Sequence, residues 1–343
     1  FGFFPSIALG YVVSNEKFFA PIRDVVSMVK LKASYGLVGN DQIGGDRRFI
    51  YNETVIGGGK YYFGTTPSQY TSVRLGEFPN PNVGWEKAKK LNLGADLSFF
   101  NQLNISVDYF KENRQRKSIP MYVGLSTKPW VNIGKMRNSG IDASLEYHQP
   151  LGKDLHLTVR SNFTYARNRI MDQDEPDYAY TYMNHSGQMQ WQKFGLVAAG
   201  LFQDQEDIDS WAKQSFGEVK PGDIKYLDLN GDGIVDNYDT KPIGYSDIPE
   251  IVYGFGFSLQ WKAFDLSAFF QGVAHVSFST LTDQTQAFVG RNLKESSVFA
   301  DLYGNTWTPE NPGAKYPRMT TGAVDNNNQL STFWMADGRY LRL

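Results

Sequence analysis

The chain has 343 residues, of which 15% are aromatic, and its formal net charge is −2 at pH 7. This near-neutral charge excludes a strongly basic protein that binds polyanions, so nucleic acid is not an expected partner. Cysteine is absent, which excludes disulfides, cysteine-ligated zinc and a thiol nucleophile. The 24 Phe, 20 Tyr and 33 Gly favour strands and turns over helices, so the composition predicts an all-β protein.

Apolar and polar residues alternate in segments that have the length of a membrane-crossing strand. In residues 90–99, Leu91, Leu93 and Leu97 alternate with polar residues such as Asn92 and Asp96. A barrel strand needs only about 9–11 such residues, and no apolar run is long enough for a membrane helix. The pattern predicts about nine strands, at roughly 7–14, 25–36, 90–99, 103–110, 141–148, 155–165, 251–261, 264–270 and 333–343.

Short and long connections alternate between these strands. Short turns lie at 100–102, 150–153 and 262–263, whereas long segments lie at 37–88, 114–136, 168–250 and 276–332. Outer-membrane barrels have short periplasmic turns and long extracellular loops, and structureless loops of this length are uncommon in soluble domains. The connections therefore favour a barrel. A soluble all-β protein stays open as an alternative at this point, because its strands alternate in the same way around a core.

Short motifs follow one another over the whole length of the chain. They are Phe3–Tyr11 with Ser14-Asn15-Glu16, Leu31–Gly36 with Gly39-Asn40, Trp85-Glu86-Lys87, Asn138–Asp142, Gly222–Tyr226 through Gly233, Trp307–Pro312 and Asp337–Leu343. In these motifs and in their order the chain resembles the SusC/RagA family of TonB-dependent outer-membrane transporters. Only the spacing before Lys32 departs slightly from the family pattern.

The resemblance implies an antiparallel transmembrane β-barrel of about 22 strands. Residues 1–343 would be the C-terminal part of this barrel domain, a fragment of about nine strands with long extracellular loops. The plug domain, the first barrel strands and the last strands would lie outside the chain.

The same resemblance implies a location and a function. The protein would be an integral barrel in the outer membrane of a Gram-negative bacterium of the Bacteroidetes kind, where it would import large nutrients actively. The substrate would be a glycan or a peptide. The implied partners are TonB, a SusD-like lipoprotein lid and outer-membrane lipid.

Residues 228–239 have the spacing of an EF-hand calcium loop. With Asp228 as position 1, side-chain oxygens fall at positions 1, 3, 5, 9 and 12, and Gly233 falls at the sharp turn of position 6. The spacing predicts structural calcium, although Asp239 has a shorter reach than the usual Glu. The order of strands places this loop on the side opposite the short turns, which the resemblance to the family implies is extracellular. The alternative is an Asx-rich turn without metal. The predicted ligands are Asp228, Asn230, Asp232, the Ile234 carbonyl, Asp236 and Asp239.

No arrangement typical of catalysis occurs, so the chain is not expected to be an enzyme. The four histidines lack the spacing of metal ligands, and the acidic residues at 172–177 are better explained as a solvated loop than as a glycosidase pair. The second function compatible with the residues is a soluble, calcium-containing binding or adhesion module. Aromatic residues that could contact substrate, or pack within the loops, are Trp130, Trp191, Trp211, Tyr178, Tyr180 and Tyr182.

Overall fold

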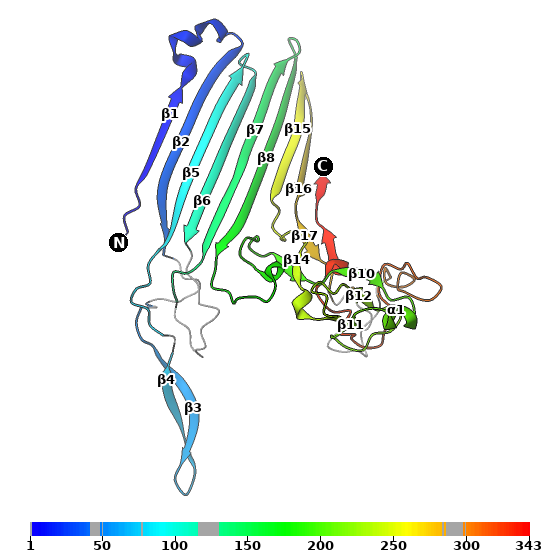
Figure 1. Ribbon diagram of the computed structural model, residues 1–343. Coiled ribbons are helices and arrows are strands. Elements are labelled where there is room, and N and C mark those ends of the chain that lie inside the picture. The colour runs from blue at the N-terminus through cyan, green and yellow to red at the C-terminus, as the bar shows by residue number, and fades with distance from the viewer. Residues whose placement is uncertain are drawn as a thin grey trace. The chain divides into compact units, whose positions relative to one another are not determined.

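The structure is a computed structural model that describes residues 2–41, 49, 51–76, 78–115, 130–282, 285, 298 and 300–343 (Figure 1). The chain divides into two compact units. The sheet unit comprises residues 1–176 and 254–269, and the lobe comprises residues 177–253 and 270–343. In the part of the chain that the structure describes, no helix is long and apolar enough to cross a bilayer.

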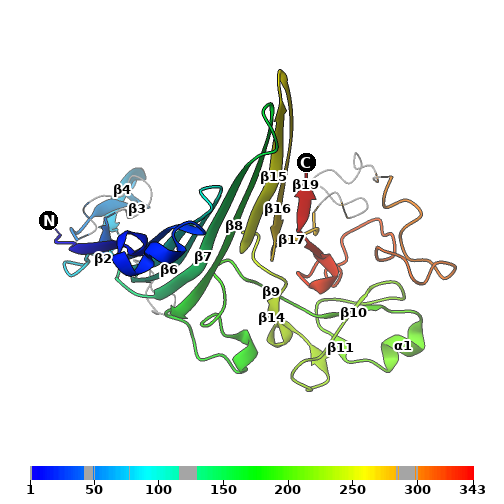
Figure 2. The same ribbon diagram turned by 90° about the horizontal axis from the view of Figure 1, so that it is seen from above.

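Nine strands form one sheet, in the order β1-β2-β5-β6-β7-β8-β15-β16-β19. Successive pairs from β1–β2 to β7–β8 are antiparallel, and together these strands form a curved, open wall (Figure 2). The all-β fold and the number of strands agree with the prediction. The nine strands are β1 (Ser6–Val12), β2 (Val26–Asn40), β5 (Glu86–Phe99), β6 (Leu103–Gln115), β7 (Lys135–Pro150), β8 (Leu155–Asp172), β15 (Ile251–Trp261), β16 (Phe264–Ala274) and β19 (Tyr340–Arg342).

The three predicted short turns lie at one end of the sheet unit (Figure 1). Between β5 and β6, Phe100 and Asn101 both have positive φ, at 52° and 53°, and the N–H of Gln102 donates to the Phe99 carbonyl. Positive φ at both central residues matches the right-handed twist of the flanking strands. The connection from β1 to β2 lies at the same end and contains two 3₁₀ helices, η1 (Val13–Asn15) and η2 (Lys17–Ile22).

Several strands extend beyond the apolar segment that predicted them, mainly at the end opposite the short turns. β5 begins at Glu86, β7 begins at Lys135 and β8 continues to Asp172. The residues added there are mainly charged or polar, so their side chains carry no alternation signal. Pairing with neighbouring strands holds these extensions in the sheet, because backbone hydrogen bonds do not depend on side-chain polarity.

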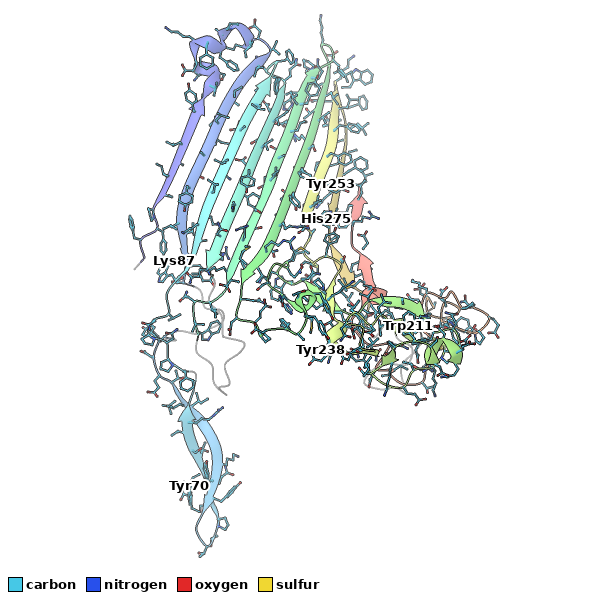
Figure 3. The ribbon with its side chains drawn as sticks, in the orientation of Figure 1. Tyr70, Lys87, Trp211, Tyr238, Tyr253 and His275 are labelled. Atoms are coloured by element: carbon cyan, nitrogen blue, oxygen red, sulfur yellow. The ribbon has the colours of Figure 1, made fainter. Side chains whose placement is uncertain are left out.

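The predicted connection 37–88 is not structureless. It contains β3 (Val55–Phe63) and β4 (Ser68–Leu75), which pair antiparallel as a separate hairpin. The register shifts between Gly57 and Lys60, and both faces of the hairpin are largely exposed, including Tyr70 (Figure 3). Because neither face is buried, the segment shows no clean alternation of apolar and polar residues.

The predicted strand 333–343 is divided. The chain forms η5 (Thr332–Trp334), then β18 (Met335–Asp337), which pairs with β17 (Ser277–Ser279), and then β19, which pairs with β16. The division falls at Gly338, whose N–H donates to the Val276 carbonyl. The prediction of a single continuous strand was therefore wrong here, although Tyr340–Arg342 does join the large sheet.

The lobe is built from two segments that are far apart in sequence. Its core includes Leu196, Ile224 and Tyr226 from the first segment and Trp307 and Trp334 from the second. Its small elements are η3 (Thr181–Met183), β9 (Lys193–Gly195), β10 (Ala198–Leu201), α1 (Gln205–Asp209), β11 (Lys213–Gln214), β12 (Ile224–Tyr226), β13 (Ile234–Val235), η4 (Asn237–Asp239), β14 (Lys241–Ile243), β17, η5 and β18.

Candidate functional site

The register of the sheet assigns each side chain to one of two faces. Residues directly opposite one another in an antiparallel ladder point to the same side. On one side, here named the apolar face, neighbouring rows are almost entirely hydrophobic. Two of these rows are Leu9–Ala33–Leu93–Tyr109–Ile141–Tyr165 and Tyr11–Leu31–Ala95–Val107–Ala143–Phe163.

Side chains of the apolar face are not covered by other parts of the sheet unit. Leu93 is 47% exposed, and Leu9, Ile141 and Phe163 are also exposed. Exposed apolar surface that spans six strands is far more than a soluble monomer normally presents to water. The hydrocarbon of a bilayer would cover it, as in transmembrane barrels, whose lipid-facing and interior residues alternate along each strand.

The opposite side, here named the polar face, carries a network of charged side chains. Lys32 Nζ lies 2.8 Å from Asp96 Oδ1 and 3.3 Å from Asp108 Oδ2, and the Ser106 hydroxyl donates to Asp96 at 2.7 Å. A row of this face reads Lys30–Asp96–Ser106–Ser144–Asn162. Such a wall suits the polar interior of a barrel and is unsuited to a hydrophobic core.

A buried ion pair joins the two segments of the lobe. Asp223 is fully buried, and its Oδ2 accepts a hydrogen bond from an Arg318 terminal nitrogen at 3.1 Å. Arg318 Nε lies 2.8 Å from Asp223 Oδ1, which adds an electrostatic contact. Asn327 Nδ2 also donates to Asp223 Oδ1 at 2.8 Å. The carboxylate therefore connects residues about a hundred positions apart in sequence.

Lys225 organises a second charged group of the lobe. Its Nζ lies 2.8 Å from Asp207 Oδ1 and 4.4 Å from the centre of the Trp211 ring. Burial opposes ionisation of Asp207, but hydrogen bonds from Lys225 and from the N–H of Gln203 outweigh it, so the pKa of this carboxyl lies below its ordinary value of 3.8. Trp211 donates from Nε1 to the Tyr226 carbonyl at 2.7 Å, so its indole packs within the lobe (Figure 3).

Acid should remove the contribution of Asp207 to the stability of the lobe. A carboxyl with a lowered pKa in the folded state stabilises that state above its unfolded pKa, near 3.8, and loses this effect as pH falls through the folded pKa. We expect Asp207→Asn to be less stable than wild type at pH 7 and nearly equal to it well below pH 3.8. Protease resistance of the lobe across a pH series measures this difference. A difference between wild type and Asp207→Asn that stays the same at every pH would contradict the expectation.

The calcium-type loop is held in shape by its own acidic side chains. Asp228 accepts the N–H of Gly231 at 2.6 Å with one oxygen and the N–H of Gly233 at 2.7 Å with the other. Gly233 has φ of +87°, in the left-handed region that favours glycine and that the sharp turn at position 6 requires. Asn230 Oδ1 accepts the N–H of Asp232, whose Oδ1 in turn accepts the N–H of Ile234.

The end of the loop is buried and capped. Asp239 is fully buried; its Oδ1 accepts the N–H of Leu229 at 2.7 Å and its Oδ2 accepts that of Asp236 at 2.8 Å. Asp236 accepts the N–H of Tyr238, completing a capping box. The six predicted ligands thus share one ordered turn. Among the described residues, no group of three or more acidic or histidine side chains is arranged to hold a metal ion.

Aromatic side chains gather beside this loop. The Tyr180 and Tyr182 rings stack with centroids 5.3 Å apart, and Tyr238 meets Tyr180 edge-on. The Tyr182 hydroxyl donates to the Tyr238 carbonyl at 2.8 Å, and burial, together with the charge of Asp239, raises the pKa of Tyr182. Tyr178 lies 6.0 Å from the ring of His185. Tyr180 and Tyr182 therefore pack on each other and on Tyr238 of the loop.

The remaining candidates are scattered. Trp191 is 65% exposed on the lobe, whereas the Trp130 carbonyl, in the sheet unit, accepts a hydrogen bond from Asn80. Asp172 forms an ion pair with Lys135 at 3.0 Å. The buried carboxylate of Asp223, which contacts Arg318 and Asn327, was not recognised as important from the sequence, although it lies within the motif Gly222–Tyr226. Its burial depends on partners about a hundred residues away, which a local pattern does not show.

The two faces of the sheet agree with what comparison with known proteins shows. The family model of the TonB dependent receptor-like β-barrel matches residues 1–326. The chain is 28% identical to TonB-dependent receptor P3 of Formosa agariphila, covering 100% of this chain and 34% of that protein. It is also 28% identical to TonB-dependent receptor SusC of Bacteroides thetaiotaomicron, covering 99% of this chain and 33% of that protein.

A solved structure, that of the RagAB peptide transporter, matches with a TM-score of 0.73 at 21% identity, over 99% of this chain and 36% of that chain. The chain spans about a third of the length of the curated relatives it matches. The resemblance to SusC and RagA proteins that the motifs suggested is confirmed by these matches. The chain therefore belongs to the TonB-dependent receptor-like β-barrel family and is located in the outer membrane.

Proposed function

We propose that the protein imports large nutrients, either oligosaccharides or oligopeptides, across the outer membrane with energy delivered through TonB. The observation that carries this proposal is the two-faced sheet, whose apolar rows suit lipid and whose Lys32–Asp96–Asp108 network suits a hydrated interior. A barrel of about 22 strands encloses a lumen wide enough for such solutes. A soluble binding module is disfavoured, because water would meet the whole apolar face.

The partner that we propose is a SusD-like surface lipoprotein. Support comes from the kinship with SusC and from the lobe, a compact unit with a hydrophobic core of its own. The lobe offers a larger ordered surface for contact with another protein than the rim of a simple pore would. TonB would act through parts of the protein outside these residues.

Growth experiments separate the substrate classes. A strain that lacks the gene should fail to grow on either an oligosaccharide or an oligopeptide, while it grows normally on the corresponding monosaccharide or amino acids. Complementation with the whole gene should restore growth, and removal of TonB should abolish it again. Normal growth of the deletion strain on every polymeric source, or uptake without TonB, would show that the protein is not this importer.

We also propose that the chain has no catalytic role. Several of the described residues that ionise form ion pairs or hold turns, as with Lys225–Asp207 and the Asp228 turn. Import needs binding and gating and does not need bond cleavage. Incubation of the purified whole protein with oligosaccharides or peptides should leave their masses unchanged, and cleavage lost through a single substitution would overturn this.

We propose, in addition, that residues 228–239 bind calcium. Four carboxylates lie within twelve residues, and Asp228 and Asp232 are at least partly exposed. A carboxylate oxygen that accepts one N–H keeps a second lone pair for a cation. Binding would need small rotations of Asp228 and Asp232 toward a shared centre. The cation would reduce the repulsion between these carboxylates and stiffen the loop beside Tyr180 and Tyr182, so its role would be structural.

Terbium offers a direct test of this loop, because tyrosines such as Tyr182 and Tyr238 can sensitise its luminescence. The whole protein should give a signal that calcium displaces, with a dissociation constant on the order of 10⁻⁴–10⁻³ M, as in extracellular modules. Asp232→Asn should weaken the signal at least several-fold, whereas Asp325→Asn, an acidic residue of the lobe outside the loop, should not. No displaceable signal, or equal loss in both variants, would mean that the EF-hand spacing is coincidental.

A further inference from the structure

A band of basic residues continues the apolar face toward the end opposite the short turns. In register, Lys89 is opposite Asn113, Asn113 is opposite Arg137, and Arg137 is opposite Arg169. All of these residues share the parity of Leu93 and lie on its side of the sheet. The band, named the cationic band, consists of Lys87, Lys89, Lys111, Arg137, Arg167 and Arg169.

Charge is distributed unequally between the two faces at this height. In the described rows of the band, the apolar-face positions of β5, β6 and β7 carry no acidic residue. On the polar face, Glu112 lies between Lys90, at 3.3 Å, and Arg114, at 2.7 Å. On β8, Asp172 lies in the row of Lys87, through Gln115 and Lys135, and it is paired with Lys135. The larger excess of positive charge is therefore on the outward side.

The band lies at the height where a bilayer ends. Lys89 is ten residues from Phe99 along β5, which at about 3.4 Å per residue and a tilt of about 40° gives roughly 26 Å along the membrane normal. The apolar band of an outer-membrane barrel is about 25 Å tall. With Phe99 near the boundary at the short-turn end, Lys89 lies at the opposite boundary, which is the outer leaflet (Figure 3 shows Lys87 at this end of β5).

We propose that the cationic band binds the phosphate groups of lipid headgroups in the outer leaflet. Lys87 and Lys89 are exposed, and long basic side chains at a membrane boundary extend their charged ends toward headgroups while their stems lie on apolar surface. Arg137 and Arg169 bring guanidinium groups, which match phosphate oxygens in two parallel hydrogen bonds.

A lipid is favoured over a soluble anion or an acidic protein because the band and the apolar rows are continuous. Leu91 is opposite Lys111 in the same row, and Leu93 lies one row further into the apolar face. A ligand with an anionic head joined to hydrocarbon chains would meet both surfaces at once. The inference rests on the outer-membrane location of the sheet and is independent of what the protein transports.

Native mass spectrometry of the whole protein in detergent can measure this binding, with phosphatidic acid and phosphatidylcholine as probes. Wild type should retain phosphatidic acid in preference to phosphatidylcholine. The double variant Lys89→Gln with Lys111→Gln should reduce this retention about tenfold or more, since each cation near an anionic surface contributes about fivefold before screening. Lys89→Arg with Lys111→Arg should retain it.

The matched control removes two cations from the same two strands at the same height but from the polar face, through Lys90→Gln with Arg114→Gln. It should leave retention of phosphatidic acid unchanged. An equal loss of phosphatidic acid in both double variants would mean that only the net charge matters, which contradicts the proposal. A wild type that shows no preference for phosphatidic acid would also overturn it. Displacement of phosphatidic acid by equimolar inorganic phosphate would identify a simple anion site instead of a lipid site, which also contradicts it.

Discussion

Replacement of Asp223 by Ala should destabilise the lobe by about 3–5 kcal/mol, the usual cost of removing one partner from a buried ion pair. The substitution leaves the Arg318 guanidinium beside buried groups without its carboxylate, and it removes an acceptor from Asn327. Because these partners come from the second segment of the lobe, the two segments should lose their connection. The sheet unit, with its own pairing, should remain folded.

Hydrogen exchange of the whole protein measures this effect separately in the lobe and in the strands. Asp301→Asn is a suitable control, because Asp301 also pairs with a cation, Lys315, but is exposed, and exposed pairs contribute little. We expect a large loss of protection in the lobe for Asp223→Ala and almost none for Asp301→Asn. Similar protection in both variants would mean that the buried pair does not hold the segments together.

Replacement of Leu93 by Arg should destabilise the folded barrel by about 2–4 kcal/mol if its side chain lies near the bilayer midplane. Leu93 occupies a row of the apolar face between Ala33 and Tyr109 and is 47% exposed, so the cost would come from burying a cation in hydrocarbon and not from a cavity in a core. Denaturant titration of the whole protein in lipid vesicles gives this free energy.

The neighbouring residue supplies the control. Asn92 lies one position away on the polar face, opposite Ser34 and Phe110. Asn92→Arg introduces the same side chain at nearly the same depth but toward the barrel interior, so we expect a much smaller loss of stability. If both variants were equally destabilised, the assignment of the two faces would be wrong.

The sheet could be predicted from the sequence because each strand carries its own signal. Alternation such as Leu91, Leu93 and Leu97 against Asn92 and Asp96 depends only on neighbours in the chain, and it defines which face is apolar. The short turns at 100–102, 150–153 and 262–263 then fixed the pairing of strands. The motifs added the family, which alternation alone could not distinguish from a soluble all-β protein.

Other parts of the fold were not predictable in this way. The hairpin of β3 and β4 exposes both faces, so no apolar period marks it, and Gly338 divides the last segment where a continuous strand was expected. The lobe depends on contacts such as Asp223 with Arg318, which lie 95 residues apart. Local patterns do not report such pairs. They did identify the Asp228–Asp239 turn, while calcium in it stays a prediction.

Spin labels along β5 test most directly whether the apolar face meets lipid and the polar face meets water. Labels placed singly at residues 91 to 97 of the whole protein in vesicles should alternate. Labels at positions 91, 93, 95 and 97 should be relaxed mainly by oxygen dissolved in the lipid. Labels at positions 92, 94 and 96 should be relaxed mainly by a water-soluble nickel complex, or be held by contacts inside the barrel. Equal accessibility of adjacent positions to both reagents, without a period of two, would contradict the account.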